Sequence, residues 1–286
     1  MNQKTLDGAI VVVTGATSGI GRATAEALAG KGAHVVIVSR DASRCAELAE
    51  HIARTGGVAT FFAADLSNQR EVRAAAEFIC ARFPRVDVLV NNAGAIFEKR
   101  LVSADGFEMT WALNHLSYFL LTHLLLDALK AAPAARIINV SSDAHFAVRH
   151  IPFDDLNFER RPYRAFGAYS LSKLANVMFT YALVRRLEGT RVTANALHPG
   201  AVATNFGRNL GGLLGWAFRT LVARFALTPQ QGAQTSIYLA TTPEVARQSG
   251  LYFDRCRPKR SSPLSYDRDA QERLWAISAA QTGLAI

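Results

Sequence analysis

The chain has 286 residues, of which 50% are hydrophobic and 19% are charged. This length and composition predict one α/β domain with a large buried core and no disordered linker. The net charge of +9 comes from scattered basic residues, which favours a basic soluble surface over a nucleic-acid interface. Three distant cysteines, Cys45, Cys80 and Cys256, indicate neither a disulfide framework nor a zinc site, so we expect no metal.

The first eight residues are polar, unlike a signal peptide, and the first apolar run, 9–13, is too short to span a membrane. We therefore expect a cytoplasmic protein. The predicted strands are, in chain order, 9–13, 35–38, 58–63, 86–90, 136–140, 192–197 and 251–253. The predicted helices are 20–29, 42–53, 69–82, 107–129, 169–187 and 229–241.

The predicted strands are almost wholly apolar and alternate with the helices along the chain. Such strands are buried on both faces, as in a parallel sheet that helices cover from both sides. The pattern predicts a doubly wound α/β fold, a parallel sheet in a three-layer Rossmann arrangement. Because no linker or long repeat interrupts the pattern, we expect a single domain over residues 1–286.

A glycine-rich segment, 14–22, follows the first predicted strand and opens the first helix. In this position Gly15 allows a tight turn, Gly19 lets the backbone approach a pyrophosphate, and Gly21 lets helix and sheet pack closely. The free N–H groups at the start of the following helix attract phosphate. Glycine also marks ordinary turns, but its position after the first strand favours a dinucleotide site.

The spacing G-x-x-x-G-x-G begins a set of motifs that resembles the short-chain dehydrogenase/reductase family. The further matches are Asp65, Asn91-Asn92-Ala93-Gly94, Ser142, Tyr169-x-x-x-Lys173 and Pro199-Gly200. The resemblance covers nearly the whole chain, and the motifs together are highly specific. It implies an oxidoreductase that moves a hydride between a nicotinamide cofactor and a carbonyl or alcohol carbon.

The same resemblance implies which residues contact the cofactor. Asp65 is expected to contact adenine and Thr204 the carboxamide, while Asn91 ties the central strands. The expected cofactor-binding residues are Gly15, Thr17, Ser18, Gly19, Ile20, Gly21, Ser39, Arg40, Asp65, Leu66, Asn92, Ala93, Gly94, Tyr169, Lys173, Pro199, Gly200, Val202 and Thr204.

Cofactor choice should be visible where the second strand ends. An acidic residue there would accept hydrogen bonds from the ribose 2′-hydroxyl of NAD. This chain has Ser39-Arg40 followed by Asp41, and an arginine pairs with a 2′-phosphate and stacks on adenine. The alternative is a solvated arginine at the start of a loop. Similar pairs in the resembled family accompany NADP(H), which we therefore expect.

Tyr169 and Lys173 are four residues apart, which places both side chains on one face of a helix. A tyrosine with a pKa of about 10 is a poor acid–base catalyst at neutral pH. We expect the Lys173 ammonium, together with an oxidised nicotinamide, to lower that pKa. Tyr169 would then give a proton to a carbonyl oxygen or take one from an alcohol. An exposed Tyr/Lys pair is common on helices, but the accompanying motifs favour catalysis.

Ser142 follows the predicted strand 136–140, at the edge where parallel sheets bind ligands. Ser141 is the neighbouring candidate, and because side chains alternate across a strand, we expect one of the two to point into the site. The resemblance selects Ser142 and implies a hydrogen bond to the substrate oxygen. It also implies that Asn114, through water, links Lys173 to solvent as a proton relay.

Three further segments bear on the substrate. The insert 143–165 and the tail 254–286 are similar to the retinol-dehydrogenase-like branch of the family, which implies a retinal-like or other apolar aldehyde or ketone. The apolar segment at about 205–228 is predicted to be a lid over an apolar pocket. The alternatives for this segment are an interfacial helix on a membrane, which we weigh lower, and a plain packed helix.

Two other functions compete with this prediction. One is a catalytically weak NADP(H)-binding sensor, and the other is an enzyme of the same family acting on a steroid, polyketide or quinone. The resemblance further implies a homodimer or homotetramer built from the helices near 107–129 and 169–187, unless the insert and the tail block it.

Overall fold

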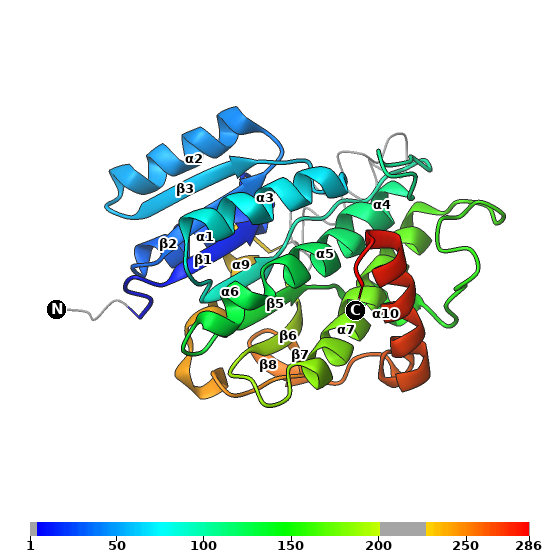
Figure 1. Cartoon of the computed structure of the whole chain (residues 1–286). Coiled ribbons are helices and arrows are strands. Elements are labelled where there is room, and N and C mark those ends of the chain that lie inside the picture. Colours follow the sequence, from blue (N-terminus) through cyan, green and yellow to red (C-terminus); the bar gives the residue numbers. More distant parts are fainter. Residues whose placement is uncertain (1–4, 201–226, 286) are drawn as a thin grey trace.

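The structure of the chain, a computed structural model, describes residues 5–200 and 227–285 (Figure 1). Its strands are β1 (Ile10–Thr14), β2 (His34–Ser39), β3 (Val58–Ala63), β4 (Val88–Asn91), β5 (Arg136–Val140), β6 (Thr193–His198), β7 (Tyr252–Asp254) and β8 (Arg257–Lys259). Within the described residues they form one sheet in the order β3-β2-β1-β4-β5-β6-β7-β8. Neighbouring strands are parallel except β7 and β8, which are antiparallel.

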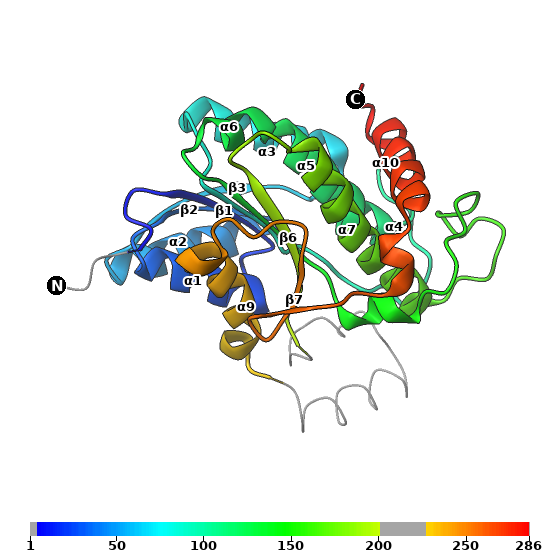
Figure 2. The ribbon, with the colours of Figure 1, turned by 90° about the horizontal axis from the view of Figure 1, so that it is seen from below.

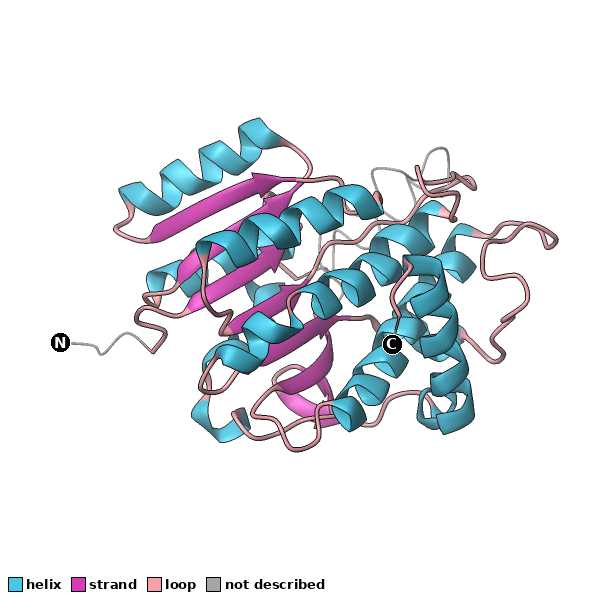
Figure 3. Ribbon diagram, viewed as in Figure 1, coloured by secondary structure: helices cyan, strands magenta, loops and turns pink. Residues whose placement is uncertain are grey.

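Helices cover both faces of the sheet (Figures 2 and 3). One layer contains α1 (Gly19–Gly30), α2 (Ala42–Arg54) and α9 (Pro229–Thr241). The other contains α3 (Gln69–Arg82), α4 (Met109–Trp111), α5 (Ser117–Leu124), α6 (Leu126–Ala131) and α7 (Ala165–Arg186). A last helix, α10 (Arg268–Thr282), packs outside α7 and α5. The predicted doubly wound α/β fold is confirmed.

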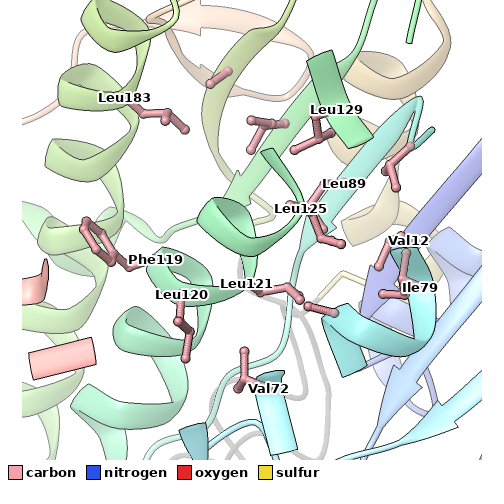
Figure 4. Packing of buried hydrophobic residues seen from close by; sticks show 14 of the residues in the cluster. Val12, Val72, Ile79, Leu89, Phe119, Leu120, Leu121, Leu125, Leu129 and Leu183 are labelled. Atoms are coloured by element: carbon pink, nitrogen blue, oxygen red, sulfur yellow. The ribbon is translucent and has the colours of Figure 1, made fainter. Parts of the chain in front are cut away.

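Successive residues of each central strand enter different hydrophobic cores. In β1, Val12 packs with Ile79 in the core beneath α3 and α5 (Figure 4). Its neighbours Val11 and Val13 pack with Leu28 in the core beneath α1 and α2. Each fully buried valine or leucine contributes roughly 1.5–3 kcal/mol. This burial on both faces is the physical reason that the central strands are wholly apolar.

The edge strand β3 departs from the predicted two-sided burial. Val58 is 55% exposed and Phe61 is 36% exposed, and within residues 5–200 and 227–285 β3 has a neighbouring strand on one side only. The apolar composition of this strand therefore does not reflect a central position.

The helix predicted over 107–129 is not continuous. It begins with α4, widens into a π-helical turn at Ala112–Leu116, continues as α5, and breaks again at Leu125 before α6. A π-helical turn has i→i+5 bonding and is found most often as a single turn inside an α-helix. In this turn the Asn114 carbonyl oxygen accepts a hydrogen bond from Asn176 Nδ2 of α7 (2.9 Å). The break thus fixes Asn114 against α7.

The insert and the tail both fold against the end of α7. The insert begins with a 3₁₀ turn at Asp143–Ala147, and its residues Ile151 and Phe158 are buried with Leu174 of α7. The tail forms β8 and α10, two elements that the sequence pattern does not predict. The predicted lid, about 205–228, lies outside the described residues except for its last two.

A helix needs both sufficient length and sufficient apolar character to cross a lipid bilayer. Within residues 5–200 and 227–285, no helix of this chain has both.

Candidate active site

A groove of about 480 Å³ opens at the carboxyl ends of the central strands. Within the described residues, the predicted cofactor-binding residues that line it are Gly15, Thr17, Ser18, Gly19, Ile20, Gly21, Ser39, Arg40, Asp65, Leu66, Asn92, Ala93, Gly94, Tyr169, Lys173 and Pro199. Gly200 follows Pro199 with φ +87°. Val202 and Thr204 lie outside the described residues. The structure therefore brings the separate sequence motifs together on one groove.

At two positions the glycine loop requires a residue without a Cβ atom. Gly15 has φ +65°, and a Cβ atom there would lie 2.8 Å from Ala93 Cα. A Cβ atom on Gly21 would lie 2.5 Å from Asn92 Nδ2. Both distances are too short for real Cβ contacts, so the loop backbone lies directly against the end of β4. This leaves the loop surface open to a phosphate-bearing ligand.

Thr14 and Asn92 join the glycine loop to the neighbouring strand. Thr14 Oγ1 accepts hydrogen bonds from the backbone N–H groups of Asn92 (2.9 Å) and Ala93 (3.0 Å), and Asn92 Nδ2 donates to the Thr14 carbonyl oxygen (2.8 Å). The side chain of Asn91 points toward β5 instead, where its Nδ2 donates to Asn139 Oδ1 (2.9 Å). These bonds hold the ends of β1, β4 and β5 together beneath the groove.

Basic and hydroxyl groups gather at the end of the groove beside β2. Ser39 Oγ shares a hydrogen bond with Thr17 Oγ1 (2.9 Å), and Arg40 and Arg44 line the groove beside them. Asp41 caps α2: its Oδ1 accepts from Ser43 Oγ and from Arg44 N. Asp41 lines the groove too, with its carboxylate used in the helix cap, and the two arginines beside it make this end of the groove suited to an anionic group.

The motifs do not reveal every residue of the groove. Arg44 also lines it, and its place one helical turn after Arg40, at the start of a predicted helix, is a signal that could have found it. Phe97 and Leu113 add apolar surface to the groove. No pattern in the sequence marks these two, because they come from a loop and from the π-helical turn.

Tyr169 and Lys173 lie on α7 at the floor of the groove. Lys173 is 3% exposed; its Nζ donates to the Val140 carbonyl oxygen (2.9 Å) and lies 5.6 Å from the centre of the Tyr169 ring. Burial lowers the pKa of Lys173 to about 7. Burial also raises the pKa of Tyr169 to about 12, and a hydrogen bond with Ser142 opposes this rise.

The structure separates the two serines at the end of β5. Ser141 is buried, and its Oγ donates to the Lys173 carbonyl oxygen (2.7 Å). Ser142 is half-buried and bonds to Tyr169. Ser141 thus braces α7, while Ser142 joins Tyr169 and Lys173 in one cluster.

Asn114 is fully buried at the π-helical turn. Its Oδ1 accepts from the Ala95 N–H (2.9 Å), and its Nδ2 donates to the Ala95 carbonyl oxygen (3.0 Å) and to Ser172 Oγ (3.0 Å). These contacts place Asn114 between the loop that follows β4 and the helix that carries Lys173.

Comparisons with known proteins agree with this geometry. Residues 9–152 match the profile of the short chain dehydrogenase family. Human retinol dehydrogenase 13 is 44% identical over 292 residues, covering 99% of this chain and 87% of that protein. A solved structure of an uncharacterised protein from Mycobacterium paratuberculosis is 33% identical with a TM-score of 0.80, covering 98% of this chain and 95% of that one. The Pseudomonas aeruginosa RhlG/NADP active-site complex is 29% identical with a TM-score of 0.70, covering 88% and 97%.

The identity to human retinol dehydrogenase 13 extends over nearly the whole length of both chains. The matched region of this chain therefore spans the insert and the tail as well as the glycine loop and the Tyr169–Lys173 pair. This chain belongs to the short-chain dehydrogenase/reductase family of oxidoreductases, in its retinol-dehydrogenase-like branch.

Proposed function

We propose that the chain is an NADP(H)-dependent oxidoreductase that acts on the carbonyl or alcohol carbon of a hydrophobic small molecule. The observation that carries the proposal is the single groove that joins the glycine loop, Arg40 and Arg44 to the Tyr169–Lys173 pair. The groove offers a phosphate site at one part and an acid–base pair at another. This is the arrangement that a nicotinamide dinucleotide and a small substrate would need together.

Bound in this groove, NADP(H) would supply or accept the hydride. Tyr169 is protonated at neutral pH, since even the ordinary tyrosine pKa of about 10 lies above 7 and burial raises it further, so it can donate its proton to a carbonyl oxygen. Ser142 can donate a hydrogen bond to the same oxygen and so stabilise the charge that develops there. Lys173 would orient the cofactor ribose and, when protonated, favour the phenolate that Tyr169 leaves behind.

The preference for NADP(H) is supported by the end of the groove beside β2. Arg40 and Arg44 can meet a 2′-phosphate there, with the Ser39 hydroxyl beside them. Asp41 also lines the groove, but its Oδ1 caps α2 and its Oδ2 lies 3.5 Å from Arg44 Nε, so both carboxylate oxygens already face a donor or a cation. The likeness to the RhlG/NADP complex gives further support.

A retinal-like or other apolar aldehyde or ketone is the proposed substrate class. The name of the related human retinol dehydrogenase supports it. Two phenylalanines support it as well: Phe146, four residues after Ser142, is 42% exposed, and Phe166, three residues before Tyr169, is 58% exposed. Both lie on the segments that carry catalytic side chains, where an apolar substrate would gain from contact with them.

The cofactor part of the proposal is tested by titrating NADPH and NADH into the purified protein. We expect NADPH to bind at least about tenfold more tightly, because a charge-assisted phosphate contact is worth roughly 1.5–3 kcal/mol. Arg40→Ala should remove most of this difference and leave NADH binding unchanged. A preference for NADH in the unmodified protein would contradict the role given to Arg40.

The catalytic part is tested by NADPH consumption with a panel of apolar aldehydes and ketones. Tyr169→Phe should lower the turnover rate by about 100-fold or more, because it removes the proton donor, while NADPH still binds. Retention of the rate within about tenfold, equivalent to roughly 1.4 kcal/mol of barrier, would show that Tyr169 is not the acid–base catalyst.

A further inference from the structure

Ser142 begins a short turn, residues 142–147, that we call the serine turn. The Ser142 backbone is extended (φ −164°, ψ 152°) and caps the 3₁₀ turn Asp143–Ala147. The Ala144 N–H donates to Ser142 Oγ (3.2 Å). Because one lone pair of the hydroxyl accepts this hydrogen bond, its single proton can point either toward Tyr169 or toward the oxygen of a bound substrate. The orientation of the catalytic serine therefore depends on where the serine turn is held.

His145 holds the serine turn from inside the protein. It is fully buried; its Nδ1 lies 2.6 Å from the Ser142 carbonyl oxygen, and its Nε2 lies 3.0 Å from the Ser262 backbone nitrogen. A carbonyl oxygen can only accept a hydrogen bond, and a backbone N–H can only donate one. The ring must therefore be neutral, with its proton on Nδ1. His145 thus links Ser142 to Ser262 of the C-terminal tail through a single tautomer.

Asp143 holds the same turn from a second side. Tyr252 Oη donates to its Oδ1 (2.8 Å), and Lys259 Nζ donates to its Oδ2 (2.9 Å). Its backbone N–H donates to His198 Nδ1 (3.2 Å). The residue that follows the catalytic serine is therefore tied to the ends of β6, β7 and β8, two of which come from the C-terminal part of the chain.

Among the described residues that line the groove, Ser141 is the last one on this stretch of chain, and Ser142, Asp143 and His145 lie just beyond it. His145 reaches the site through its hydrogen bond with the Ser142 carbonyl oxygen, and Asp143 through its peptide bond with Ser142. We propose that His145, bonded between Ser142 and the tail residue Ser262, is a positioning residue for the catalytic serine, and that the segment 252–262 is thereby a working part of the active site. The inference rests on the proposed function, because it assigns the serine a place in catalysis.

Small displacements of Ser142 are expected to slow the reaction. A displacement of a catalytic group by about 1 Å costs on the order of 100-fold in rate. Without the His145 ring nitrogens, the Ser142 carbonyl oxygen and the Ser262 N–H would lose their hydrogen-bond partners. The serine turn would then adopt a different position. The loss should appear in kcat, whereas the cofactor groove, which His145 does not touch, should bind NADPH as before.

The test compares three variants of the full-length protein. His145→Phe keeps an aromatic ring beside Tyr252 (ring centres 4.8 Å apart) but removes both hydrogen bonds. His145→Gln retains one donor and one acceptor and should rescue most of the function. Tyr181→Phe is the matched control: it removes the bond between Tyr181 and Ser261 (2.7 Å), which ties the same tail segment to α7 without touching the serine turn.

With NADPH and an apolar aldehyde that the unmodified enzyme reduces, we expect His145→Phe to lower kcat by about tenfold or more. NADPH affinity should stay within about twofold, as expected for a residue outside the groove. His145→Gln and Tyr181→Phe should stay near the unmodified rate. Equal kcat in His145→Phe and the unmodified enzyme, or an equal loss in Tyr181→Phe, would overturn the inference.

A second readout needs no substrate, so it separates this inference from the proposed function. Ser142→Cys, made with Cys80→Ser and Cys256→Ser, places a thiol at the catalytic position, and its alkylation rate reports its surroundings. Adding His145→Phe should change that rate several-fold, whereas adding Tyr181→Phe should not. If no aldehyde is turned over but the alkylation rate changes as stated, the proposed function fails and the positioning role stands. An unchanged alkylation rate overturns the positioning role.

Discussion

Lys173 carries an energetic cost in the cofactor-free protein. Its ammonium is 3% exposed, and burial lowers its pKa from 10.5 to about 7. Between pH 7 and about 10.5 the unfolded chain therefore binds one proton more than the folded chain, so the free energy of unfolding rises with pH across this window. Below pH 7 the penalty is present in full. The groove thus holds a destabilising group at the position where the proposed mechanism needs it.

Replacement of Lys173 should reveal this cost. At pH 7, without cofactor, Lys173→Met should raise the free energy of unfolding by roughly 2–4 kcal/mol relative to the unmodified chain. The gain should shrink toward pH 10, while turnover is lost. Urea unfolding of both proteins across this range is the measurement. A difference that does not vary with pH would mean that Lys173 is not desolvated in the native state.

The residues of the site were predictable where a motif marks them. Tyr169, Lys173 and the glycine loop meet on one groove, as their positions after successive strands imply. The expected effect of Lys173 on its neighbour does not appear without cofactor, because burial raises the pKa of Tyr169 and lowers that of Lys173 itself. The spacing of residues in the sequence indicates which groups lie close together, but it does not indicate how far these groups are shielded from water.

Among the elements, α10 shows why a helix can escape sequence analysis. It begins at the Asp267 cap, whose side chain accepts from the Ala270 N–H (3.0 Å), and it ends at Gly283 with φ 64°. Its inward face includes polar residues: Ser278 Oγ shares a hydrogen bond with His115 Nε2 of the π-helical turn (2.8 Å). Because buried polar groups replace part of the apolar stripe, the usual helical periodicity is weak.

The attachment of α10 should depend on one aromatic side chain. Trp275 is 7% exposed, its ring centre lies 5.0 Å from that of Phe119, and the Arg186 guanidinium lies 3.8 Å from it. Trp275→Ala should lower the free energy of unfolding by about 3–5 kcal/mol in urea titrations. As a comparison, Glu272→Gln breaks the exposed ion pairs with Arg186 and Arg185 and should cost less than about 1 kcal/mol. Equal losses would mean that charge, not packing, docks the helix.

At the scale of the molecule, α10 covers part of the surface of α5 and α7 that another chain could otherwise contact. It lies over α7 and contacts α5 (Figure 2), the two helices through which the family resemblance implies dimers or tetramers. A second copy cannot reach their covered residues, such as Phe119 and Phe179, which already contact Trp275. The tail, whose structure the sequence pattern did not indicate, therefore changes the expectation for assembly.

We expect the protein not to dimerise through α5 and α7. Sedimentation velocity at micromolar concentration should give a monomer, or an oligomer whose contacts lie elsewhere on the surface. A dimer whose formation slows amide hydrogen exchange along both α5 and α7 would contradict this expectation. The control is α2, in the other helix layer, where exchange should not change.

The short strand β8 has a consequence for behaviour at high concentration. It forms one outer edge of the sheet, and all three of its residues, Arg257, Pro258 and Lys259, are exposed. Proline offers no N–H to a further strand, and the two cations repel another copy of themselves, so strand addition and fibril growth are blocked at this edge. At the opposite edge, β3 exposes Val58 and Phe61. Any strand-to-strand aggregation of the native protein would therefore begin at β3.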